Sequence, residues 1–303
     1  VLNPSDTLPA GCSLIDPVTQ VSVGVDHSCD LLASGVVTCW GKNDDGQLGN
    51  GTYDLARTSV KVNGITSAIS ISAGYNHTCV IKLGYVYCWG YNGYGNLGDG
   101  TLVDAKTMPT TPVKLADGSY LKNVESIDAS ANSTCALTSA GAMYCWGYNY
   151  YGEIGDGTTT NRSIPTPVTG LSSGVAYIAT GVASTCAVKT DGSLYCWGYN
   201  ANGQLGDNTA TQRTTPVQVI TAANTPITNV IQVSLGWKHT CAIKVGGALY
   251  CWGYNNYYQM ADGTITSRST PQLVPGMTAG VTDVDLGFSG ICAIKSGAQI
   301  GRA

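Results

Sequence analysis

Short runs of alternating apolar and polar residues recur along the chain, and no stretch has the 3.6-residue apolar period of an amphipathic helix. In the most regular segment, Ser126 to Ala129 is predicted to form a short inner strand. Residues 134–138 and 142–146 are predicted to form a hairpin around Ala140. Thr166-Pro167-Val168 is predicted to open a last strand at a sheet edge, because proline cannot donate to a ladder. The segment therefore reads as four strands.

The same frame recurs at regular intervals, which indicates a repeat architecture. Its C-W-G tryptophans are Trp40, Trp89, Trp146, Trp197 and Trp252, spaced by 49, 57, 51 and 55 residues. The edge proline recurs at Pro112, Pro216 and Pro271, whereas the first copy has Ser59 there. Four strands per repeat, arranged radially, are typical of a β-propeller, which leaves few exposed sheet edges.

A sixth copy begins without finishing, so six inner strands are predicted. They are Val21 to Gly24, Ile69 to Ala73, Ser126 to Ala129, Ala176 to Thr180, Gln232 to Leu235 and Asp283 to Leu286. The prediction is a single all-β propeller over residues 21–303, with six four-stranded antiparallel blades. Residues 1–20 contain three prolines and are predicted to be an extended arm that completes the last blade and closes the ring. Seven blades is the alternative, if this arm forms a degenerate blade.

The repeated motif, G-x-x-H-T-C-A-I-K-x-x-G-x-x-Y-C-W-G-x-N-x-x-G-x-L-G-D-G-T, resembles the repeat of the regulator of chromosome condensation family. The likeness covers residues 21 to about 297, and it implies a β-propeller, most often with seven blades. Cysteine at both hairpin positions and a count of six copies depart from the usual pattern. The nearer likeness is to secreted bacterial members with a C-W-G signature. The founder's nucleotide exchange on a small nuclear GTPase is therefore not expected here.

Composition narrows the class of partner. Of the 303 residues, 43% are apolar and 11% are charged, with a net charge of -4. No basic run could follow a phosphate backbone, so nucleic acid is not an expected partner. No apolar run approaches the roughly 20 residues of a membrane-spanning helix. Val1 is interpreted as a processed terminus.

Ten of the twelve cysteines occur as hairpin pairs. Residues ten apart around a three-residue turn, as Cys135 and Cys145 are, face each other within disulfide range. The pairs are Cys29 with Cys39, Cys79 with Cys88, Cys135 with Cys145, Cys186 with Cys196, and Cys241 with Cys251. Five disulfides are predicted, each stabilising by roughly 3 kcal/mol. Zinc is disfavoured, because each repeat offers two thiolates without further ligands. So many disulfides predict an extracellular or cell-surface location.

Cys12 and Cys292 are left over. Cys292 has the first hairpin position of the unfinished copy, so Cys12 in the arm is predicted to bond with it inside the chain. Residues 11–14 would then pair beside Ile291 to Lys295. The alternative is an arm that reaches a neighbouring molecule and gives a covalent head-to-tail polymer.

The histidines and loop aspartates are expected to be structural. His27, His77 and His239 share one repeat position, where a hydrogen bond to a backbone carbonyl is expected. The Asp-Gly pairs, such as Asp156-Gly157, are interpreted as turns, because a calcium site needs six to eight oxygens. No acid, base and nucleophile cluster together. The chain is therefore not predicted to be an enzyme, and no metal or cofactor is expected.

Tyrosine supplies the candidate interaction residues, with 18 in the chain against one phenylalanine. The predicted contacts lie in the loop after C-W-G and are Tyr94, Tyr150, Tyr151, Tyr257 and Tyr258. Tyrosine is enriched at protein interfaces and can also stack on sugar rings. Packing of these rings on the propeller itself is the alternative. Four sequons, at Asn50, Asn76, Asn132 and Asn161, are candidate glycosylation sites if the source organism glycosylates.

These features favour a non-enzymatic extracellular protein, a surface, matrix or filament subunit whose propeller faces contact copies of itself or another protein. The alternative is a soluble secreted inhibitor or binding module that captures one protein or glycan partner. Within the resembled family, one secreted member captures β-lactamases in this way.

Overall fold

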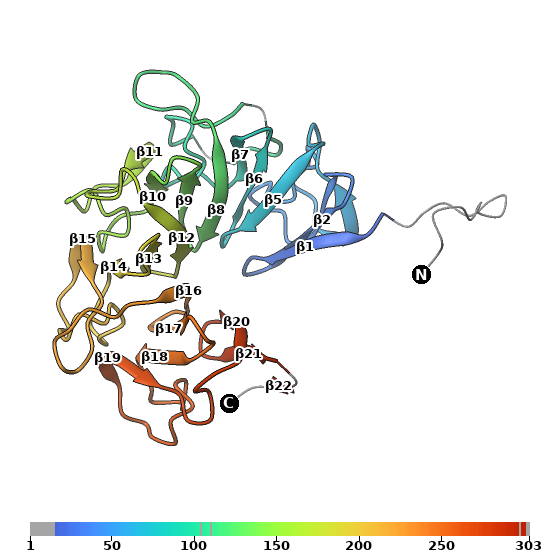
Figure 1. The fold of residues 1–303 in the computed structure, drawn as a ribbon. Helices are drawn as coiled ribbons and strands as arrows, with labels where there is room; N and C mark the ends of the chain where they lie inside the picture. Colours follow the sequence, from blue (N-terminus) through green and yellow to red (C-terminus); the bar gives the residue numbers. More distant parts are fainter. Residues whose placement is uncertain (1–15, 104, 110, 297, 301–303) are drawn as a thin grey trace.

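The computed structural model describes residues 16–103, 105–109, 111–296 and 298–300. These residues form six antiparallel sheets that follow one another in chain order around a common axis (Figure 1). The part of the chain that is described contains no helix, which confirms the all-β prediction. It therefore also contains no helix that is long and apolar enough to cross a membrane.

Four of the sheets have four strands, ordered from the axis outward. The first is β1 (Val18–Val23), β2 (His27–Leu32), β3 (Val37–Gly41) and β4 (Ala56–Lys61); the third is β8 (Val124–Ser130), β9 (Ser133–Thr138), β10 (Met143–Gly147) and β11 (Arg162–Pro167); the fourth is β12 (Val175–Thr180), β13 (Ser184–Lys189), β14 (Leu194–Gly198) and β15 (Arg213–Gln218); the fifth is β16 (Val230–Leu235), β17 (His239–Lys244), β18 (Leu249–Gly253) and β19 (Arg268–Leu273).

Among the described residues the second and sixth sheets have three strands each; four were predicted per blade, but the arm predicted to complete the sixth lies largely outside the described residues. The strands of these two sheets are β5 (Ala68–Ala73), β6 (His77–Lys82) and β7 (Tyr85–Gly90), and β20 (Val281–Leu286), β21 (Ile291–Lys295) and β22 (Ala298–Ile300).

One inserted residue explains the missing outer strand of the second sheet. Gly90 still pairs with Lys106, and the N–H of Val113 still donates to Val86, as at the two ends of the other outer strands. Lys106 and Val113 are seven positions apart, whereas Arg162 and Val168, their counterparts in the third sheet, are six apart. Because a one-residue slip reverses the side-chain pattern of a strand, the ladder between these ends is lost. Among the described residues between β7 and β8 there is thus no outer strand at Pro112, where an edge strand was predicted.

The inner strands begin earlier than the sequence pattern predicted. β1 starts at Val18, before the predicted Val21, and β16 starts at Val230, before Gln232. A register shift follows the first residue of each inner strand, as between Val18 and Gln20. A bulge interrupts the two-residue alternation that the prediction relied on.

The sheets do not close into a ring within the described residues. The first sheet (blue) and the sixth (red) stand at the two ends of the series, and their strands do not pair (Figure 1). The arm that was predicted to close the ring lies largely outside the described residues, so closure by residues 1–15 stays a prediction. The pairing predicted for residues 11–14 beside Ile291 to Lys295 is wrong from Ala293 onward, because β20 and β22 occupy the two edges of β21 there.

The hydrophobic core is divided among the junctions between consecutive sheets. At the junction of the fourth and fifth sheets, Cys186, Cys196 and Leu205 pack against Val233 and Trp252. Equivalent clusters fill the other four junctions. Each sheet therefore covers the inner strand of the next, and the stability of one depends on its neighbour.

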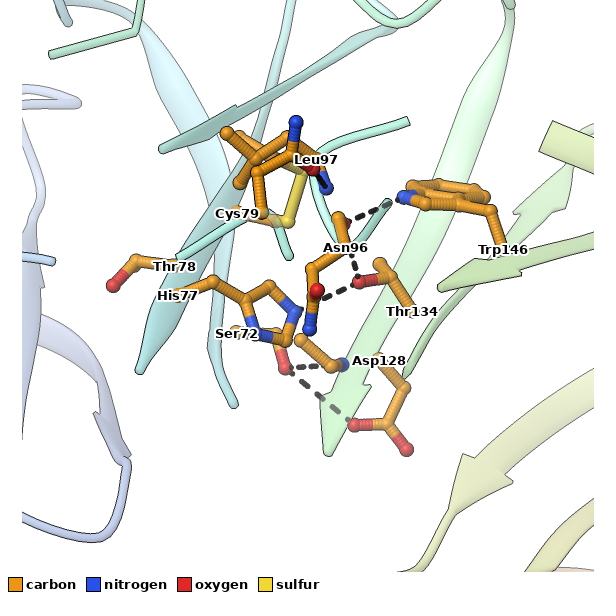
Figure 2. Close-up of a disulfide and its surroundings, with 12 residues drawn as sticks. Ser72, His77, Thr78, Cys79, Asn96, Leu97, Asp128, Thr134 and Trp146 are labelled. Atoms are coloured by element: carbon orange, nitrogen blue, oxygen red, sulfur yellow. Dashed lines mark hydrogen bonds between the residues drawn. A yellow bond between two sulfur atoms is a disulfide. The ribbon is translucent and has the colours of Figure 1, made fainter. Parts of the chain in front are cut away.

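At four of the five junctions, one loop carbonyl accepts two hydrogen bonds from the next sheet. The carbonyl oxygen of Asn96 in the second sheet accepts hydrogen bonds from Trp146 Nε1 at 2.8 Å and Thr134 Oγ1 at 3.2 Å, both in the third (Figure 2). The carbonyls of Gln47, Glu153 and Gln204 accept the same two donors in the next sheet. We call this arrangement the inter-sheet latch.

The five hairpin pairs are disulfide-bonded in the structure, with Cα atoms 4.0 to 4.1 Å apart. Each pair lies in the core of a junction, facing the next sheet. A disulfide here therefore supports the contact between two sheets as well as its own hairpin.

Candidate protein-binding face

A buried asparagine holds the loop that follows each C-W-G. Asn149 donates from Nδ2 to the carbonyls of Thr158 and Thr160 at 3.2 and 3.0 Å, and its Oδ1 accepts the N–H of Ile154 at 2.9 Å. The same role falls to Asn43, Asn92, Asn200 and Asn255. Because one amide supplies both donors and an acceptor, it closes the loop and fixes the aromatic residues on it.

Aspartates of the same loops form turns and ion pairs. Asp156 accepts the N–H of Thr158 at 2.9 Å, and its Oδ2 lies 2.5 Å from Arg162 Nη2. Burial alone would raise the pKa of Asp156, but the bonds from Thr158 and Arg162 outweigh it and hold that pKa below its usual range. Among the described residues, no three His, Cys, Asp or Glu side chains are placed to hold a metal ion. Turn formation accounts for these aspartates.

A continuous series of tyrosine rings crosses the second, third and fourth sheets. Neighbouring ring centroids are 4.8 to 6.3 Å apart, mostly edge to face. The series is Tyr91, Tyr94, Tyr148, Tyr150, Tyr151 and Tyr199. Aromatic rings attract each other at such spacings, and Tyr150 is nevertheless 63% exposed. The rings support one another while presenting apolar surface to solvent.

These rings lie around one mouth of the central cavity. The N–H of Tyr148 donates to Asn132, and that of Tyr254 donates to Lys238, so each ring-bearing loop is tied to the turn after an inner strand. Such turns, including residues 74–76 and 236–237, line the end of the cavity. The tyrosine loops therefore share one face of the molecule.

A second aromatic group belongs to the fifth and sixth sheets. Trp237 stacks on Phe288 with ring centroids 4.4 Å apart and an interplanar angle of 17°. Lys238 Nζ lies 3.6 Å from the Trp237 centroid and 5.8 Å from that of Tyr254, at cation–π distance. Tyr254 also contacts Tyr257 at 6.0 Å. We call the two aromatic groups, with Lys238, the aromatic face.

The aromatic face is interrupted between the fourth and fifth sheets. Ala201 and Asn202 stand at the loop positions that Tyr150 and Tyr151 occupy in the third sheet. A shallow groove of about 490 Å³ opens there beside Tyr254. The groove makes the aromatic face uneven, so a partner that binds it would need a complementary shape.

The central cavity, of about 1150 Å³, is bounded by the six inner strands. On its wall, Asp128 accepts the N–H of Thr180 at 2.6 Å, and burial raises the pKa of Asp128 to about 6. The pKa of Tyr177 is raised to about 12, mainly by burial and also by the negative charge of nearby carboxylates. The hydroxyl of Ser72 accepts the N–H of Ala129 at 2.8 Å (Figure 2). These groups bind the neighbouring inner strand, and the described lining contains no histidine or cysteine.

The histidines are structural, but two of them have a different partner from the one expected. His27 Nε2 lies 2.9 Å from Thr78 Oγ1, and His77 Nε2 lies 2.9 Å from Thr134 Oγ1. Each threonine belongs to the next sheet, and its hydroxyl, which donates to the latch carbonyl, can still accept a hydrogen bond from the histidine ring. Burial lowers the pKa of His77 to about 3, which keeps the ring neutral. His239 follows the expectation and bonds the backbone of Gly290.

The structure brings most of the predicted tyrosines together. Tyr94, Tyr150, Tyr151 and Tyr257 belong to the aromatic face. Tyr258 is 54% exposed, and no ring contact joins it to another described residue. Whether any of them contacts a partner stays a prediction.

The sequon asparagines differ in exposure, and Cys292 is the leftover cysteine that the structure describes. Asn161 is exposed, whereas Asn50, Asn76 and Asn132 are half-buried. Cys292 is exposed and forms no disulfide with a described residue. Cys12 lies outside the described residues, so their pairing remains a prediction.

Sequence reasoning missed six of the ten rings of the aromatic face. Tyr91, Tyr148, Tyr199 and Tyr254 follow C-W-G directly, and this fixed repeat position could have identified them. Trp237 and Phe288 lie two residues after the inner strands β16 and β20, at a position that varies between copies and gave no signal.

The comparisons with known proteins agree with the observed fold. Over residues 3–300 the chain matches the family described as RCC1-like domain. It is 29% identical over 265 residues to the ultraviolet-B receptor UVR8 of Arabidopsis thaliana, covering 86% of this chain and 59% of UVR8. It is also 29% identical to the human probable E3 ubiquitin-protein ligase HERC4, covering 86% of this chain but 19% of HERC4. The chain thus spans about three fifths or less of these relatives.

Solved structures show the same architecture. Human WBSCR16 superposes with a TM-score of 0.78 at 22% identity, over 92% of this chain and 72% of that one. Yeast RCC1 (Prp20), solved with Kap60 bound, superposes with a TM-score of 0.75 at 21% identity, over 92% and 66%. Members of this fold bind proteins, as that complex illustrates. From the repeated frame, the six sheets and the match over nearly its whole length, the chain belongs to the RCC1-like domain family of β-propeller repeat proteins.

Proposed function

We propose that this chain is a non-enzymatic interaction domain that binds a protein partner through the aromatic face, outside the cytoplasm. The observation that carries the proposal is the continuous, half-exposed series of tyrosines held on rigid loops. Tyrosine and tryptophan are the side chains that most often dominate binding energy at protein interfaces. Rings already packed on one another lose little freedom when a partner binds.

The location is inferred from the disulfides. Five hairpins carry disulfides in the structure, and such bonds persist in oxidising compartments and are rare in the cytosol. An extracellular or cell-surface site of action is therefore the second part of the proposal.

The partner is either another copy of the chain, in a surface or filament assembly, or a different protein captured by a soluble module. The aromatic face carries one cation, Lys238, among its rings. A largely uncharged partner surface with apolar or hydroxyl-bearing side chains complements it, since a strongly charged surface would lose hydration without gaining ion pairs.

The test places a photo-crosslinking amino acid at position 150 and treats the protein in medium from its native source. A discrete adduct is expected, and mass spectrometry tells whether it contains a second copy or another protein. The matched control carries the same amino acid at position 120, since Tyr120 is also exposed but pairs with Tyr85 away from the aromatic face. Equal adducts at both positions, or none at 150, would contradict the proposal.

A further inference from the structure

The groove between the fourth and fifth sheets is lined mainly by polar side chains. The loops after β14 and β18 and the start of β19 border it, and its volume is about 490 Å³. Sites that hold small molecules typically have volumes of roughly 300 to 1,000 Å³. The ring of Tyr254 contributes to the wall, and the polar side chains include Asn202, Asn208, Thr209, Asn256 and Arg268. We call this site the loop groove.

The loop groove is open because the fourth repeat has small residues at its border. Ala201 and Asn202 stand where the third repeat has two tyrosines. In the third repeat, the second of these, Tyr151, packs on Tyr199 of the next sheet with ring centroids 4.8 Å apart. Tyr254 is the counterpart of Tyr199 in the fifth repeat, and Asn202 offers it no ring. One side of Tyr254 therefore borders the groove.

A second departure from the repeat places an amide in the groove. Asn208 is exposed and stands where the other four copies of the loop have glycine, in the same left-handed conformation, with a φ of 60°. Its Nδ2 donates to Asn224 Oδ1 at 3.2 Å, and its Oδ1 accepts from Ser269 Oγ at 3.4 Å. These two bonds hold the amide in place. Each of its polar atoms still has capacity for one further hydrogen bond.

A third departure leaves a cation of the groove with few partners. The arginines at one position of the third and fourth repeats donate from Nε to the loop aspartate, at 2.6 and 2.8 Å. Arg268 has this position in the fifth repeat, but its Nη2 lies 3.8 Å from Asp262 Oδ2. Its Nε has no hydrogen-bond partner among the described residues. Because a guanidinium stays charged, Arg268 can take a further acceptor.

We propose that the loop groove binds a uronic acid, a ring-shaped sugar that carries one carboxylate. The carboxylate pairs with Arg268, because a planar guanidinium presents parallel N–H donors to both carboxylate oxygens. Sugar hydroxyls donate and accept hydrogen bonds, and so do the side-chain amides of Asn202, Asn208 and Asn256. The ring of Tyr254 offers apolar surface to the C–H groups of the sugar.

Two other anions fit the loop groove less well. A phosphate group carries about 1.5 to 2 negative charges at pH 7, and the nearby Asp262 carboxylate would repel it more than a singly charged carboxylate. An acidic side chain of a protein would pair with Arg268 but has no hydroxyls for the amides, which would lose hydration without replacement. The sugar acid satisfies both the cation and the amides.

The experiment titrates the full chain with glucuronate, galacturonate and mannuronate at neutral pH and follows binding by ligand-observed NMR. Saturable one-to-one binding of at least one of the three is expected. The methyl ester of the bound sugar has the same ring without the charge, and it should bind at least tenfold more weakly. Acetate has the charge without the ring, and it should also bind at least tenfold more weakly.

Four variants assign the binding to the loop groove. Arg268→Gln should weaken it at least tenfold, whereas the matched control Arg162→Gln should leave it unchanged, because Arg162 has the same repeat position but lies outside the groove. Asn208→Gly restores the residue of the other copies and should weaken binding several-fold. Ala201→Tyr combined with Asn202→Tyr reproduces the third repeat and should abolish it. Circular dichroism of every variant checks that it is folded.

Failure of all three uronates to bind the wild-type chain would overturn the proposal, as would equal binding by the Arg268→Gln and Arg162→Gln variants. A methyl ester or acetate that binds as tightly as the uronates would overturn it too, because the charge or the sugar ring would then contribute nothing. The inference does not rest on the proposed protein partner. Crosslinking at position 150 tests that partner separately, with no sugar present.

Discussion

At the scale of single residues, the junctions depend on a carbonyl that accepts two hydrogen bonds at once. A carbonyl oxygen has two lone pairs, and the indole and the hydroxyl of the next sheet use both. In a fully buried site each donor is worth more than on the surface, because the alternative is an unsatisfied polar group.

Trp146→Phe should therefore destabilise the protein by roughly 2 to 4 kcal/mol, from the lost hydrogen bond and the unfilled volume in the core. Trp40→Phe is the matched control and should cost less than about 1 kcal/mol, because Trp40 is half-buried and its Nε1 bonds no described residue. Urea unfolding under oxidising conditions measures both. Equal losses would mean that the latch contributes nothing of its own.

Glu153 is the carboxylate among amides at the latch position, where the other sheets have Gln47, Asn96, Gln204 and Gln259. It is 1% exposed, and its Oε1 has no partner among the described residues. Burial raises the pKa of Glu153 to about 7, only partly opposed by backbone hydrogen bonds. In the folded state the carboxyl group therefore favours its neutral form.

Glu153→Gln should stabilise the protein above pH 7, on the order of 3 kcal/mol at most. The folded pKa is raised, so ionisation penalises the folded state fully above about 7, and the penalty vanishes below the ordinary value near 4.5. The difference between variant and wild type should thus shrink as pH falls from 8 to 4. Unfolding curves across that range test it, and a difference that is constant with pH would contradict the assignment.

At the scale of elements, each hairpin disulfide lies between two sheets. Replacing Cys186 and Cys196 by alanine should cost roughly 2 to 5 kcal/mol. Because Cys186 and Cys196 pack in one cluster with Val230 and Val233, hydrogen exchange should speed up in β16 of the fifth sheet as well as in β13 and β14. Exchange in β6, two sheets away, is the internal control. Changes confined to the hairpin would show that the disulfide does not support the junction.

The repeat made most elements predictable, because the same hairpin pattern occurs in five copies. For example, β9 and β10 lie within one residue of the predicted strands 134–138 and 142–146. Pattern failed where one copy departs from the others. The inserted residue before Val113 accounts for the lost outer strand, although the residues around Pro112 resemble those of the outer strands in other copies. In the candidate site, loop tyrosines were found by type, whereas Trp237 and Phe288 meet only through the radial arrangement of sheets.

At the scale of the whole molecule, the oxidation state of the cysteines is the evidence for the proposed location outside the cytoplasm. Mass mapping without reductant should recover the five hairpin disulfides from protein purified from its native source. Such bonds, each closing a short loop in a buried core, are not expected to exchange. Ten free thiols would contradict the bonding and remove the ground for placing the protein outside the cytoplasm.

The six described sheets succeed one another in chain order, so they form a one-dimensional array in which the first and sixth sheets do not pair. Among the described residues, each internal sheet packs on two neighbours and the first and sixth sheets pack on one, so the terms of a nearest-neighbour chain apply. Unfolding should then proceed inward by fraying, with partly unfolded species that retain the third and fourth sheets. A single two-state free energy would then not describe the unfolding of these six sheets.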